Sequence, residues 1–230
     1  ERFLQADAAR RLPLDRAPLM RMGLLRTGEQ TWQFVWTTHH LVIDGWSWPI
    51  VMREVSQAYE AALDGRSPPW PPALPYRRYV DWVTQAALDA PAFWRAQLQD
   101  VDRPTPVGRG PLPAGTSAFD DQPGETVVSL PADLSAQLIE LARRWRATPG
   151  SLFNAAWALV LAHGAAQSAV VFGAAFSGRP PELDGVEGLV GPCVHDVPLR
   201  VGLDPAQAGE DWVRALHRLQ IDVAQHLYLP

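Results

Sequence analysis

The chain has 230 residues, of which 47% are hydrophobic and 20% are charged, as is usual for a soluble globular protein. Its net charge of -5 argues against a general nucleic-acid binder, which would usually be basic, so we expect no nucleic-acid partner. The single cysteine, Cys193, excludes a disulfide framework within the chain and a zinc site built from cysteines. This cysteine usage fits a cytoplasmic location.

The hydropathy of the chain gives no sign of a membrane segment. The amino terminus does not resemble a signal peptide, and no apolar stretch approaches the roughly 20 residues that cross a bilayer. We therefore expect no membrane partner. Because the sequence begins with Glu1 rather than a methionine, we expect an excised piece of a longer protein.

The first half of the chain alternates between strand and helix patterns. Residues 4–14 are expected to form a short helix or turn. Residues 19–26 and 31–38 are predicted to be strands, the second rich in β-branched and aromatic residues. Residues 48–63 carry apolar side chains at helical spacing and end before an Asp-Gly pair, which predicts a helix.

Two segments with different sequence patterns lie between the two halves of the chain. Residues 76–98 are predicted to form two helical segments that break near Pro91. Residues 101–125 are rich in proline, glycine and aspartate and show little periodicity, so we expect a long, mobile linker between two lobes.

The second half repeats the alternation of strands and helices. Strands are predicted over residues 126–130, 169–175 and 193–201, and helices over residues 131–146, from residue 149 onward, and over residues 205–227. The helix that begins near Pro149 is apolar on all sides, so we expect it to be buried. This alternation in both halves predicts a layered α/β architecture.

The most informative polar residues follow the second predicted strand, where His39 and His40 precede Asp44 and Gly45. If the strand continued through the histidines, their side chains would point to opposite faces, and only one could reach a reactive site. The same alternation argues against a metal site, and we expect none. Gly45 would suit a tight turn, and Asp44 could accept hydrogen bonds from the turn or pair with an arginine. A turn aspartate beside two structural histidines is an equally open interpretation of these residues alone.

The run His-His-Leu-Val-Ile-Asp-Gly at residues 39–45 resembles the HHxxxDG signature of nonribosomal peptide synthetase condensation domains, of the chloramphenicol acetyltransferase-like superfamily. Other segments are similar to further motifs of the family, in family order: residues 18–21, 76–82, 93–98, 171–173, 177–180, 190–192 and 197–201. Together they span nearly the whole chain and are far more specific than the first motif alone.

The resemblance implies an α/β fold of two chloramphenicol acetyltransferase-like lobes that form a V-shaped pseudo-dimer with the active site between them. Residues 1–100 would then be a portion of the N-terminal lobe, residues 101–125 the inter-lobe linker, and residues 126–230 a portion of the C-terminal lobe. Nothing matches the early Arg-His-x-x-Leu-Arg motif or the bridging elements after the last helix. We therefore expect the chain to be incomplete at both ends.

The activity that the resemblance implies is amide formation between two carrier-bound substrates. His40 would act as a general base or position the amine, and His39 would be mainly structural. Asp44 would hold the loop through an ion pair, and the backbone of Gly45 would approach the substrate. The candidate substrate contacts are Trp46, Ser47, Ser177 and His195, and the candidate ion-pair partners are Arg21, Arg179 and Arg200.

The implied partners are the donor and acceptor peptidyl carrier proteins and an adjacent adenylation domain of the same synthetase. The domain itself would bind no cofactor, because its substrates arrive on the phosphopantetheine arms of the carriers. One departure stands out: His195-Asp196 occupies a place where the family usually has Asn-Thr or Asn-Asn near the cleft. This departure leaves the substrate preference and the activity open.

Three alternatives remain. An epimerization domain shares the signature, and Ser47-Trp48 fits it, although residues 177–180 and 198–201 fit condensation better. An ester-forming variant would use a hydroxyl nucleophile, which needs a base more than an amine does. A non-catalytic platform that docks carriers or tailoring enzymes would have no need for both His40 and Asp44. A heterocyclization domain is not expected, because that group replaces the two histidines with aspartates.

Overall fold

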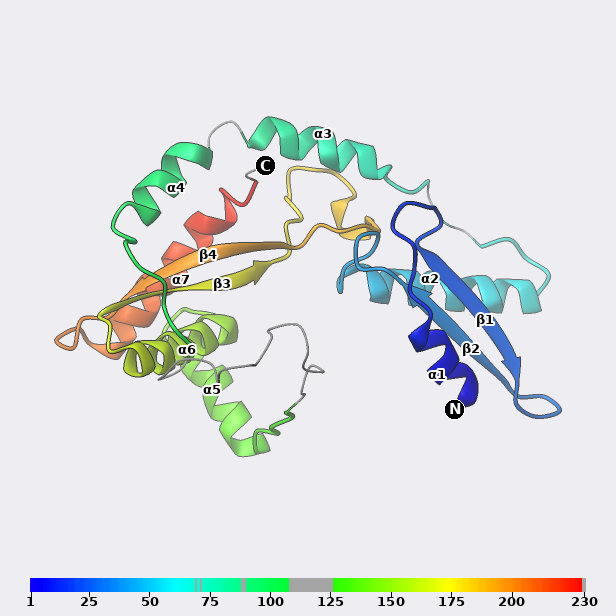
Figure 1. The fold of residues 1–230 in the computed structure, drawn as a ribbon, viewed down its shortest axis with the longest axis horizontal. Coiled ribbons are helices and arrows are strands. Elements are labelled where there is room, and N and C mark those ends of the chain that lie inside the picture. The colour runs from blue at the N-terminus through cyan, green and yellow to red at the C-terminus, as the bar shows by residue number, and fades with distance from the viewer. Residues whose placement is uncertain (69, 71, 88–89, 108–125, 229–230) are drawn as a thin grey trace. The chain divides into compact units, whose positions relative to one another are not determined.

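The computed structural model describes residues 1–68, 70, 72–87, 90–107 and 126–228. The elements along the chain can be followed in Figure 1. They are α1 (Arg2–Ala9), β1 (Met20–Arg26), β2 (Trp32–Thr38), α2 (Ser47–Leu63), α3 (Tyr76–Ala86), α4 (Ala90–Leu98), α5 (Ala132–Arg144), α6 (Pro149–Ala165), β3 (Ala169–Phe176), the 3-10 turn η1 (Val186–Gly188), β4 (His195–Gly202) and α7 (Gly209–Ala224). The alternation of strands and helices agrees with the predicted α/β class.

The contacts between Cα atoms divide the chain into two compact units. The first unit comprises Glu1–Gln85 and Ser177–His195, and the second comprises Ala86–Phe176 and Asp196–Pro230. This division groups α4 with the second unit and the loop after β3 with the first, while the predicted lobe portions, residues 1–100 and 126–230, stay a prediction. The physical reason is tertiary: Trp94 of α4 donates a hydrogen bond from Nε1 to the His226 carbonyl at 2.7 Å, within the second unit. The V-shaped two-lobe arrangement stays a prediction.

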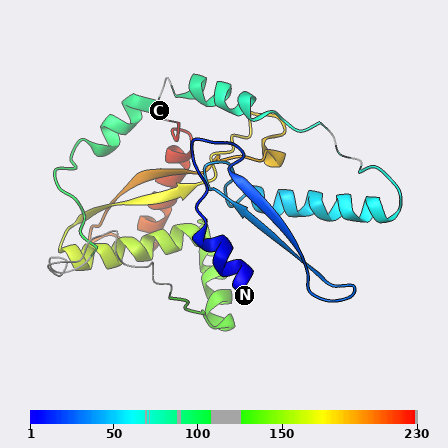
Figure 2. The same cartoon turned by 45° about the vertical axis from the view of Figure 1, so that its right-hand side comes forward.

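In the first unit, β1 and β2 form an antiparallel hairpin in which Met20 pairs with Thr38 and Arg26 with Trp32. The helix α1 lies against one face of this hairpin (Figure 2). There Asp7 accepts hydrogen bonds from Arg21 of β1 and from Thr37 of β2, which ties the helix to both strands. The two strands match the two predicted ones to within a residue at each end.

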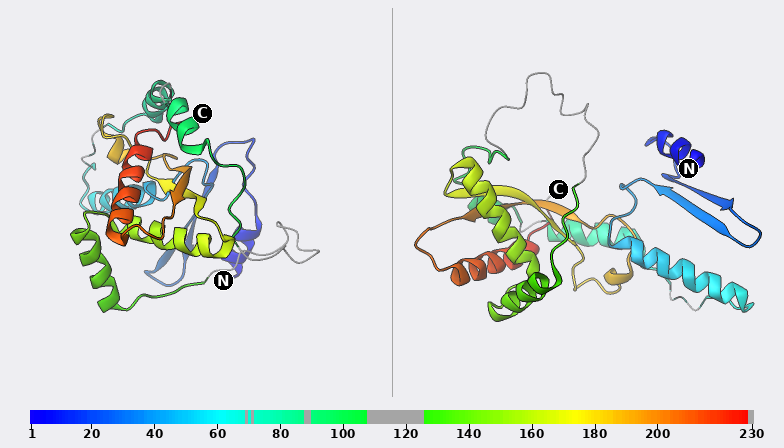
Figure 3. Two further views of the ribbon diagram at one scale, coloured as in Figure 1. Left: turned by 90° about the vertical axis from the view of Figure 1, so that its left-hand side faces the viewer. Right: turned by 90° about the horizontal axis from the view of Figure 1, so that it is seen from below.

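The helix α2 begins directly after the histidine segment and lies on the side of the hairpin opposite α1 (Figure 3, right). It buries Ser47, Ile50 and Ala61, whose spacing defines its covered face. The chain leaves the helix at Gly65, which has a φ of 66°, the left-handed conformation that a glycine adopts without a Cβ clash. The predicted helix over residues 48–63 is therefore confirmed.

One cluster of buried hydrophobic residues in the first unit lies between α3 and the loop around η1. Its buried residues are Tyr79, Leu183, Val186, Leu189 and Cys193. The predicted break between the two helices is confirmed, although Pro91 lies in the first turn of α4 rather than between the helices. A proline fits there because the first turn has no intrahelical use for its missing N–H group.

In the second unit, β3 and β4 form a two-stranded sheet. The Leu203 N–H donates to the Ser168 carbonyl at 2.7 Å, so the end of β4 lies beside the start of β3 and the strands are antiparallel. Helix α6 contacts β3, α5 and α7. It begins at Thr148, whose side chain accepts a hydrogen bond from the Ser151 N–H, as the predicted start requires.

Several predictions of local structure differ from what the fold shows; the first helix, expected over residues 4–14, is α1 at Arg2–Ala9. Residues 126–130 form no strand; Val127 and Val128 are exposed, and strand-forming residues need a ladder partner, which the described residues do not provide. Helix α6 is only partly buried, because only one of its apolar faces packs, and Phe153 and Val160 lie exposed.

Helix α7 begins at Gly209, four residues after the predicted start. Of the predicted linker, residues 108–125 lie outside the described residues. The first part of the predicted linker is bound to β3 within the second unit, because Thr105 Oγ1 accepts a hydrogen bond from the Val171 N–H at 2.9 Å.

Candidate active site

The two histidines lie just beyond β2, in a tight turn. The His39 N–H still donates to the Leu19 carbonyl at 3.0 Å, and the His39 carbonyl then accepts from the Val42 N–H at 3.1 Å. This bond closes a β-turn with His40 and Leu41 at its centre. The prediction that strand alternation separates the histidines was therefore wrong, because the strand ends at Thr38.

The turn nevertheless gives the two imidazoles different surroundings. His39 is half-buried, and its Nδ1 accepts a hydrogen bond from the Leu41 N–H at 3.1 Å. His40 is exposed to solvent at the corner of the turn. His39 thus has a structural contact within the turn, and His40 is the imidazole that an incoming molecule can reach.

Asp44 anchors this turn to the rest of the first unit. The residue is 1% exposed. Its Oδ1 accepts from the Ser47 N–H at 2.9 Å and from Ser47 Oγ at 2.7 Å, which starts helix α2. Its Oδ2 accepts from the Cys193 N–H at 2.9 Å. One carboxylate therefore joins the histidine turn, α2 and a segment close to β4.

Arg179 is the cation that pairs with Asp44. Its Nη1 lies 2.9 Å from Asp44 Oδ2, and its Nη2 lies 3.1 Å from Oδ1, a bidentate geometry. Nη2 also lies 3.2 Å from the Leu189 carbonyl, and the guanidinium carbon stands 5.6 Å from the centre of the Trp46 ring. The side chain is 3% exposed, so this is a buried ion pair.

The other two arginines considered for this pairing have different partners. Arg21 pairs with Asp7 beneath α1. Arg200 belongs to the second unit, where its Nη2 lies 3.7 Å from Asp100. Arg179 is brought to Asp44 by a loop that is distant in sequence, which local sequence reasoning could not resolve.

These contacts settle the charge of Asp44. Burial raises the pKa of the Asp44 carboxyl. Hydrogen bonds from Arg179, Ser47 and the Cys193 backbone lower the pKa by more than burial raises it, so the pKa lies well below its usual range. The carboxylate is ionised at neutral pH and both its oxygens are engaged. Asp44 is thus an anchor and not a proton acceptor for a reacting group.

Ser47 was predicted to contact substrate, but its side chain lies buried beneath the histidine turn and not on the surface. The residue is fully buried, and its Oγ accepts from the Gly191 N–H at 3.0 Å while lying 2.7 Å from Asp44 Oδ1. It therefore fixes the turn from within. Trp46, in contrast, is exposed on the outside of the same segment.

Gly45 is exposed, and a Cβ built on it would meet no atom within 4 Å. Its φ lies outside the left-handed region, so the backbone of the turn does not demand glycine here. The close approach of substrate to the Gly45 backbone stays a prediction.

Gly178 is a residue that sequence reasoning overlooked. It has a φ of 58°, and a Cβ on it would lie 1.8 Å from the Cys193 carbonyl oxygen. Glycine is therefore required for the turn that delivers Arg179. The signal was present in residues 177–180 (Ser-Gly-Arg-Pro), one of the segments similar to a family motif, where a glycine precedes the arginine. Ser177, a predicted substrate contact, lies exposed beside it.

Two tyrosines of α3 hold the segment opposite Asp44. Tyr76 donates from its hydroxyl to the Pro192 carbonyl at 2.7 Å, and Tyr79 donates to the Cys193 carbonyl at 3.3 Å. The Tyr79 oxygen also lies 3.1 Å from His195 Nε2. Their spacing of three residues puts both hydroxyls on one side of the helix. Residues 76–82 were among the segments that resemble family motifs, but the sequence alone did not predict that these two tyrosines bind the segment before β4.

Cys193 is fully buried at the centre of these contacts. Burial raises the pKa of its thiol to about 11, so the sulfur stays protonated and unreactive at neutral pH. The cysteine contributes through its backbone, since its N–H binds Asp44 and its carbonyl binds Tyr79.

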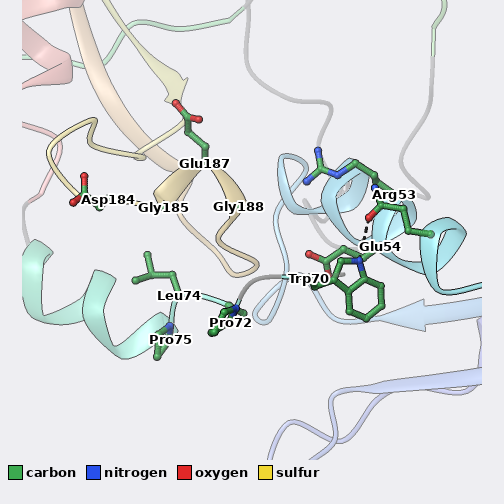
Figure 4. A pocket seen from close by; sticks show the side chains of 12 residues that line it. Arg53, Glu54, Trp70, Pro72, Leu74, Pro75, Asp184, Gly185, Glu187 and Gly188 are labelled. Atoms are coloured by element: carbon green, nitrogen blue, oxygen red, sulfur yellow. Dashed lines mark hydrogen bonds between the residues drawn. The ribbon is translucent and has the colours of Figure 1, made fainter. Parts of the chain in front are cut away.

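A surface pocket of about 810 Å³ also lies in the first unit. Figure 4 shows Arg53, Glu54 and Trp70 on one side of it and Asp184 and Glu187 on the other. None of the predicted site residues lines it.

The described parts of the chain carry neither a metal-binding cluster nor a helix that could span a membrane. No group of three His, Cys, Asp or Glu side chains among them could hold a metal ion. No helix among them is long and apolar enough to cross a membrane.

The arrangement is thus an exposed imidazole on a turn that is anchored by the buried, bidentate ion pair of Asp44 and Arg179. Comparison with known proteins relates it to one family. The profile of the condensation domain family matches residues 1–230. The chain is 37% identical over 232 residues to a linear gramicidin synthase of Brevibacillus parabrevis, an alignment that covers 99% of the chain and 3% of that protein. It is 35% identical over 218 residues to the chondramide synthase of Chondromyces crocatus, covering 94% and 6% respectively.

Solved structures agree in fold. The first condensation domain of the CDA synthetase superposes with a TM-score of 0.75 at 21% identity, covering 99% of this chain and 51% of that one. The X-domain from teicoplanin biosynthesis gives a TM-score of 0.75 at 24% identity, covering 100% and 54%. The chain therefore spans about half of each solved domain and a few per cent of each synthetase. The match over all 230 residues shows that the chain belongs to the condensation domain family of nonribosomal peptide synthetases.

Proposed function

We propose that this chain carries the histidine turn of an amide-forming condensation domain. The amine of an acceptor aminoacyl thioester attacks the thioester carbonyl of a donor acyl or peptidyl group. The tetrahedral intermediate expels the donor thiolate, the amine loses one proton, and the donor acyl group ends on the acceptor. The observation that supports this best is the exposed His40 on a turn held by the buried Asp44–Arg179 pair.

The reaction requires mainly that the protein position the amine and the thioester next to each other. An α-amine has a pKa of roughly 8, so a useful fraction is neutral at pH 7. Holding the amine and the thioester together could lower the barrier by about 7–11 kcal/mol. His40 would then accept the amine proton, position the amine or stabilise the oxyanion. A turn fixed by five hydrogen bonds to Asp44 favours such precision.

The substrates and partners follow from this role. Both substrates would hang on the phosphopantetheine arms of donor and acceptor carrier proteins, and the domain itself would bind no cofactor. An adenylation domain of the same synthetase would load the acceptor, and the whole assembly would work in the cytoplasm. Trp46, Ser177 and His195 remain candidate contacts for the arms, while Ser47 acts through the turn.

A reconstituted reaction tests the proposal. The synthetase polypeptide that carries this sequence would be given a loaded donor carrier and a loaded acceptor carrier, and the products on each carrier would be analysed by mass spectrometry and chiral chromatography. We expect an amide on the acceptor. Inversion of one aminoacyl centre without transfer would indicate an epimerization domain, and a product from hydroxyl acceptors alone would indicate the ester-forming variant.

One comparison gives the non-catalytic alternative a specific basis. The X-domain of teicoplanin biosynthesis, solved in complex with OxyB, is 26% identical to this chain with a TM-score of 0.74. A platform of that kind would bind a partner and form no product in the reconstituted reaction. Stable binding of loaded carriers without turnover would therefore replace condensation by docking as the function.

A further inference from the structure

The peptide group between Pro192 and Cys193 is bound from two sides. Its carbonyl oxygen, on Pro192, accepts a hydrogen bond from the Tyr76 hydroxyl of α3 at 2.7 Å. Its N–H, on Cys193, donates to Asp44 Oδ2 at 2.9 Å. Both groups belong to one planar, conjugated unit. The phenol of Tyr76 and the carboxylate that anchors the histidine turn are therefore connected through a single peptide group.

Hydrogen bonds joined in this way strengthen one another. A donor on the carbonyl oxygen draws electron density through the conjugated peptide, which makes the N–H of the same peptide a stronger donor. The effect is largest where the surroundings have a low dielectric constant, and Asp44 is 1% exposed. The bond from Cys193 to Asp44 is therefore stronger with the Tyr76 hydroxyl in place than without it.

The ring of Tyr76 is held in place by its neighbours. It fills the space beside Gly191, where an added Cβ would lie 2.4 Å from Tyr76 Cδ2, and its centre lies 5.5 Å from that of the Tyr79 ring. Burial is the main cause that raises the pKa of the Tyr76 hydroxyl, and Cys193 and Asp44 raise it further. The hydroxyl therefore stays protonated and acts as a fixed donor.

The segment of residues 191–193 reaches the second oxygen of Asp44 as well. The Gly191 N–H donates to Ser47 Oγ at 3.0 Å, and Ser47 Oγ donates to Asp44 Oδ1 at 2.7 Å. Both carboxylate oxygens are thus bound, directly or through Ser47, by the segment that α3 holds. Because Asp44 anchors the turn, a shift of this segment would move the turn and His40 with it.

We propose that Tyr76 is a positioning residue for His40, which acts through the Pro192–Cys193 peptide group and Asp44. Its hydroxyl is spent on the Pro192 carbonyl, so it takes no part in the proton transfers of the reaction. The effect of Tyr76 on the rate of amide formation rests on the proposed function. Its effect on the order of the histidine turn does not, which allows the two to be tested separately.

Tyr79 provides a matched comparison on the same helix. Its hydroxyl donates to the Cys193 carbonyl at 3.3 Å, one residue further along the same segment. That carbonyl belongs to the following peptide group, and the Cys193 N–H that binds Asp44 is not part of it. Removal of the Tyr79 hydroxyl therefore loosens the segment without weakening the donor to Asp44 through a shared peptide.

Hydrogen–deuterium exchange in the complete synthetase, read by mass spectrometry, tests the inference without turnover. Tyr76→Phe removes the hydroxyl and keeps the ring. We expect the amides of residues 40–47 and 190–194 to exchange about fivefold faster or more, while those of the β1–β2 hairpin keep the wild-type rate. Tyr59→Phe, which removes an exposed hydroxyl on α2, should change neither segment. Tyr79→Phe should accelerate residues 40–47 less than Tyr76→Phe does.

Three results of this measurement would overturn the inference. They are unchanged exchange in residues 40–47 of Tyr76→Phe, an equal rise in the hairpin, and an equal effect of Tyr79→Phe on residues 40–47. Replacement of Tyr76 by 3-fluorotyrosine keeps the ring and gives a stronger hydroxyl donor, so it should slow the exchange of residues 40–47. This variant decides the question where Tyr76→Phe does not fold, and faster exchange in it would contradict the inference.

The rate of amide formation between loaded carriers tests the consequence for His40. Tyr76→Phe should lower kcat roughly tenfold, less than the ~10²-fold cost of a 1 Å misplacement, and leave KM unchanged. The 3-fluorotyrosine variant should keep at least the wild-type rate. A folded Tyr76→Phe variant with wild-type kcat would overturn the positioning role. If the wild-type synthetase forms no amide, the proposed function fails, and the exchange rates alone decide whether Tyr76 positions the turn.

Discussion

The guanidinium of Arg179 forms a bidentate ion pair with the carboxylate of Asp44, with N–O distances of 2.9 and 3.1 Å, across 135 residues of sequence. Both side chains are almost fully buried. Through this pair the loop after β3 holds the turn that carries His40. The pair is therefore the structural foundation of the candidate site.

Removing the anchor should cost much stability. In Asp44→Ala the buried charge of Arg179 loses its counter-ion, which typically costs about 3–5 kcal/mol. Urea unfolding of the condensation domain would measure the loss. The control is Asp81→Ala, whose exposed pair with Arg77 contributes little, so its unfolding free energy should stay close to that of the wild type. Equal losses in the two variants would show that Asp44 is not an anchor.

Gly178 should tolerate no side chain. A Cβ would lie 1.8 Å from the Cys193 carbonyl oxygen, and the φ of 58° strains any other residue, so Gly178→Ala should cost more than about 2 kcal/mol. Gly164→Ala is the matched control, because that glycine is inside α6 with nothing within 4 Å of a Cβ. It should stabilise by about 0.5–1 kcal/mol. Thermal melts of the two variants should therefore shift in opposite directions.

The Asp44–Arg179 pair should also make the unfolding free energy depend on pH. The pKa of Asp44 lies lower in the folded than in the unfolded protein, where it is about 3.9. Its contribution is then complete above pH 4 and is lost as the pH falls toward the folded pKa. Ser47→Ala removes one hydrogen bond to the carboxylate and weakens this dependence. In urea unfolding from pH 7 to pH 2.5, the wild-type advantage over Ser47→Ala should shrink below pH 4; a constant difference would contradict the assignment.

His40 should matter for rate and not for folding. Because it is exposed, His40→Ala should leave the melting temperature nearly unchanged. If it accepts the amine proton, the rate of amide formation between loaded carriers should fall by about 10²–10⁴-fold. His39→Asn serves as the comparison, since an asparagine can still accept the Leu41 N–H and should retain most of the activity. A folded His40→Ala variant with unchanged rates would exclude the general-base role.

Alanine substitutions of Ser47 and Ser177 should distinguish a structural role from a contact with substrate. Ser47 is buried with its hydroxyl engaged, whereas Ser177 is exposed. Ser47→Ala should therefore lower the unfolding free energy by about 1–3 kcal/mol, because buried partners lose a hydrogen bond. Ser177→Ala should leave stability unchanged and, if it contacts a carrier arm, raise KM with little change in kcat. A stability loss at Ser177 alone would reverse the two roles.

The sequence by itself predicted those elements whose pattern is local. The apolar period of α2 and the β-branched residues of β2 sufficed to locate both elements, because helix and strand geometry repeat over short distances. The same reasoning failed for residues 126–130, where a strand pattern has no ladder partner among the described residues, and for α6, where all-round hydrophobicity does not say which face is covered.

The motif at residues 39–45 was likewise legible in the sequence, and its family resemblance agreed with the profile match over the whole chain. Only the tertiary structure decided that the histidines stand in a turn beyond β2, that Arg179 rather than Arg21 or Arg200 neutralises Asp44, and that Ser47 is buried in the anchor. The reason is physical: the histidine pattern is encoded along a few neighbouring residues. The partner of a buried charge depends instead on which distant segment the fold brings within hydrogen-bond distance.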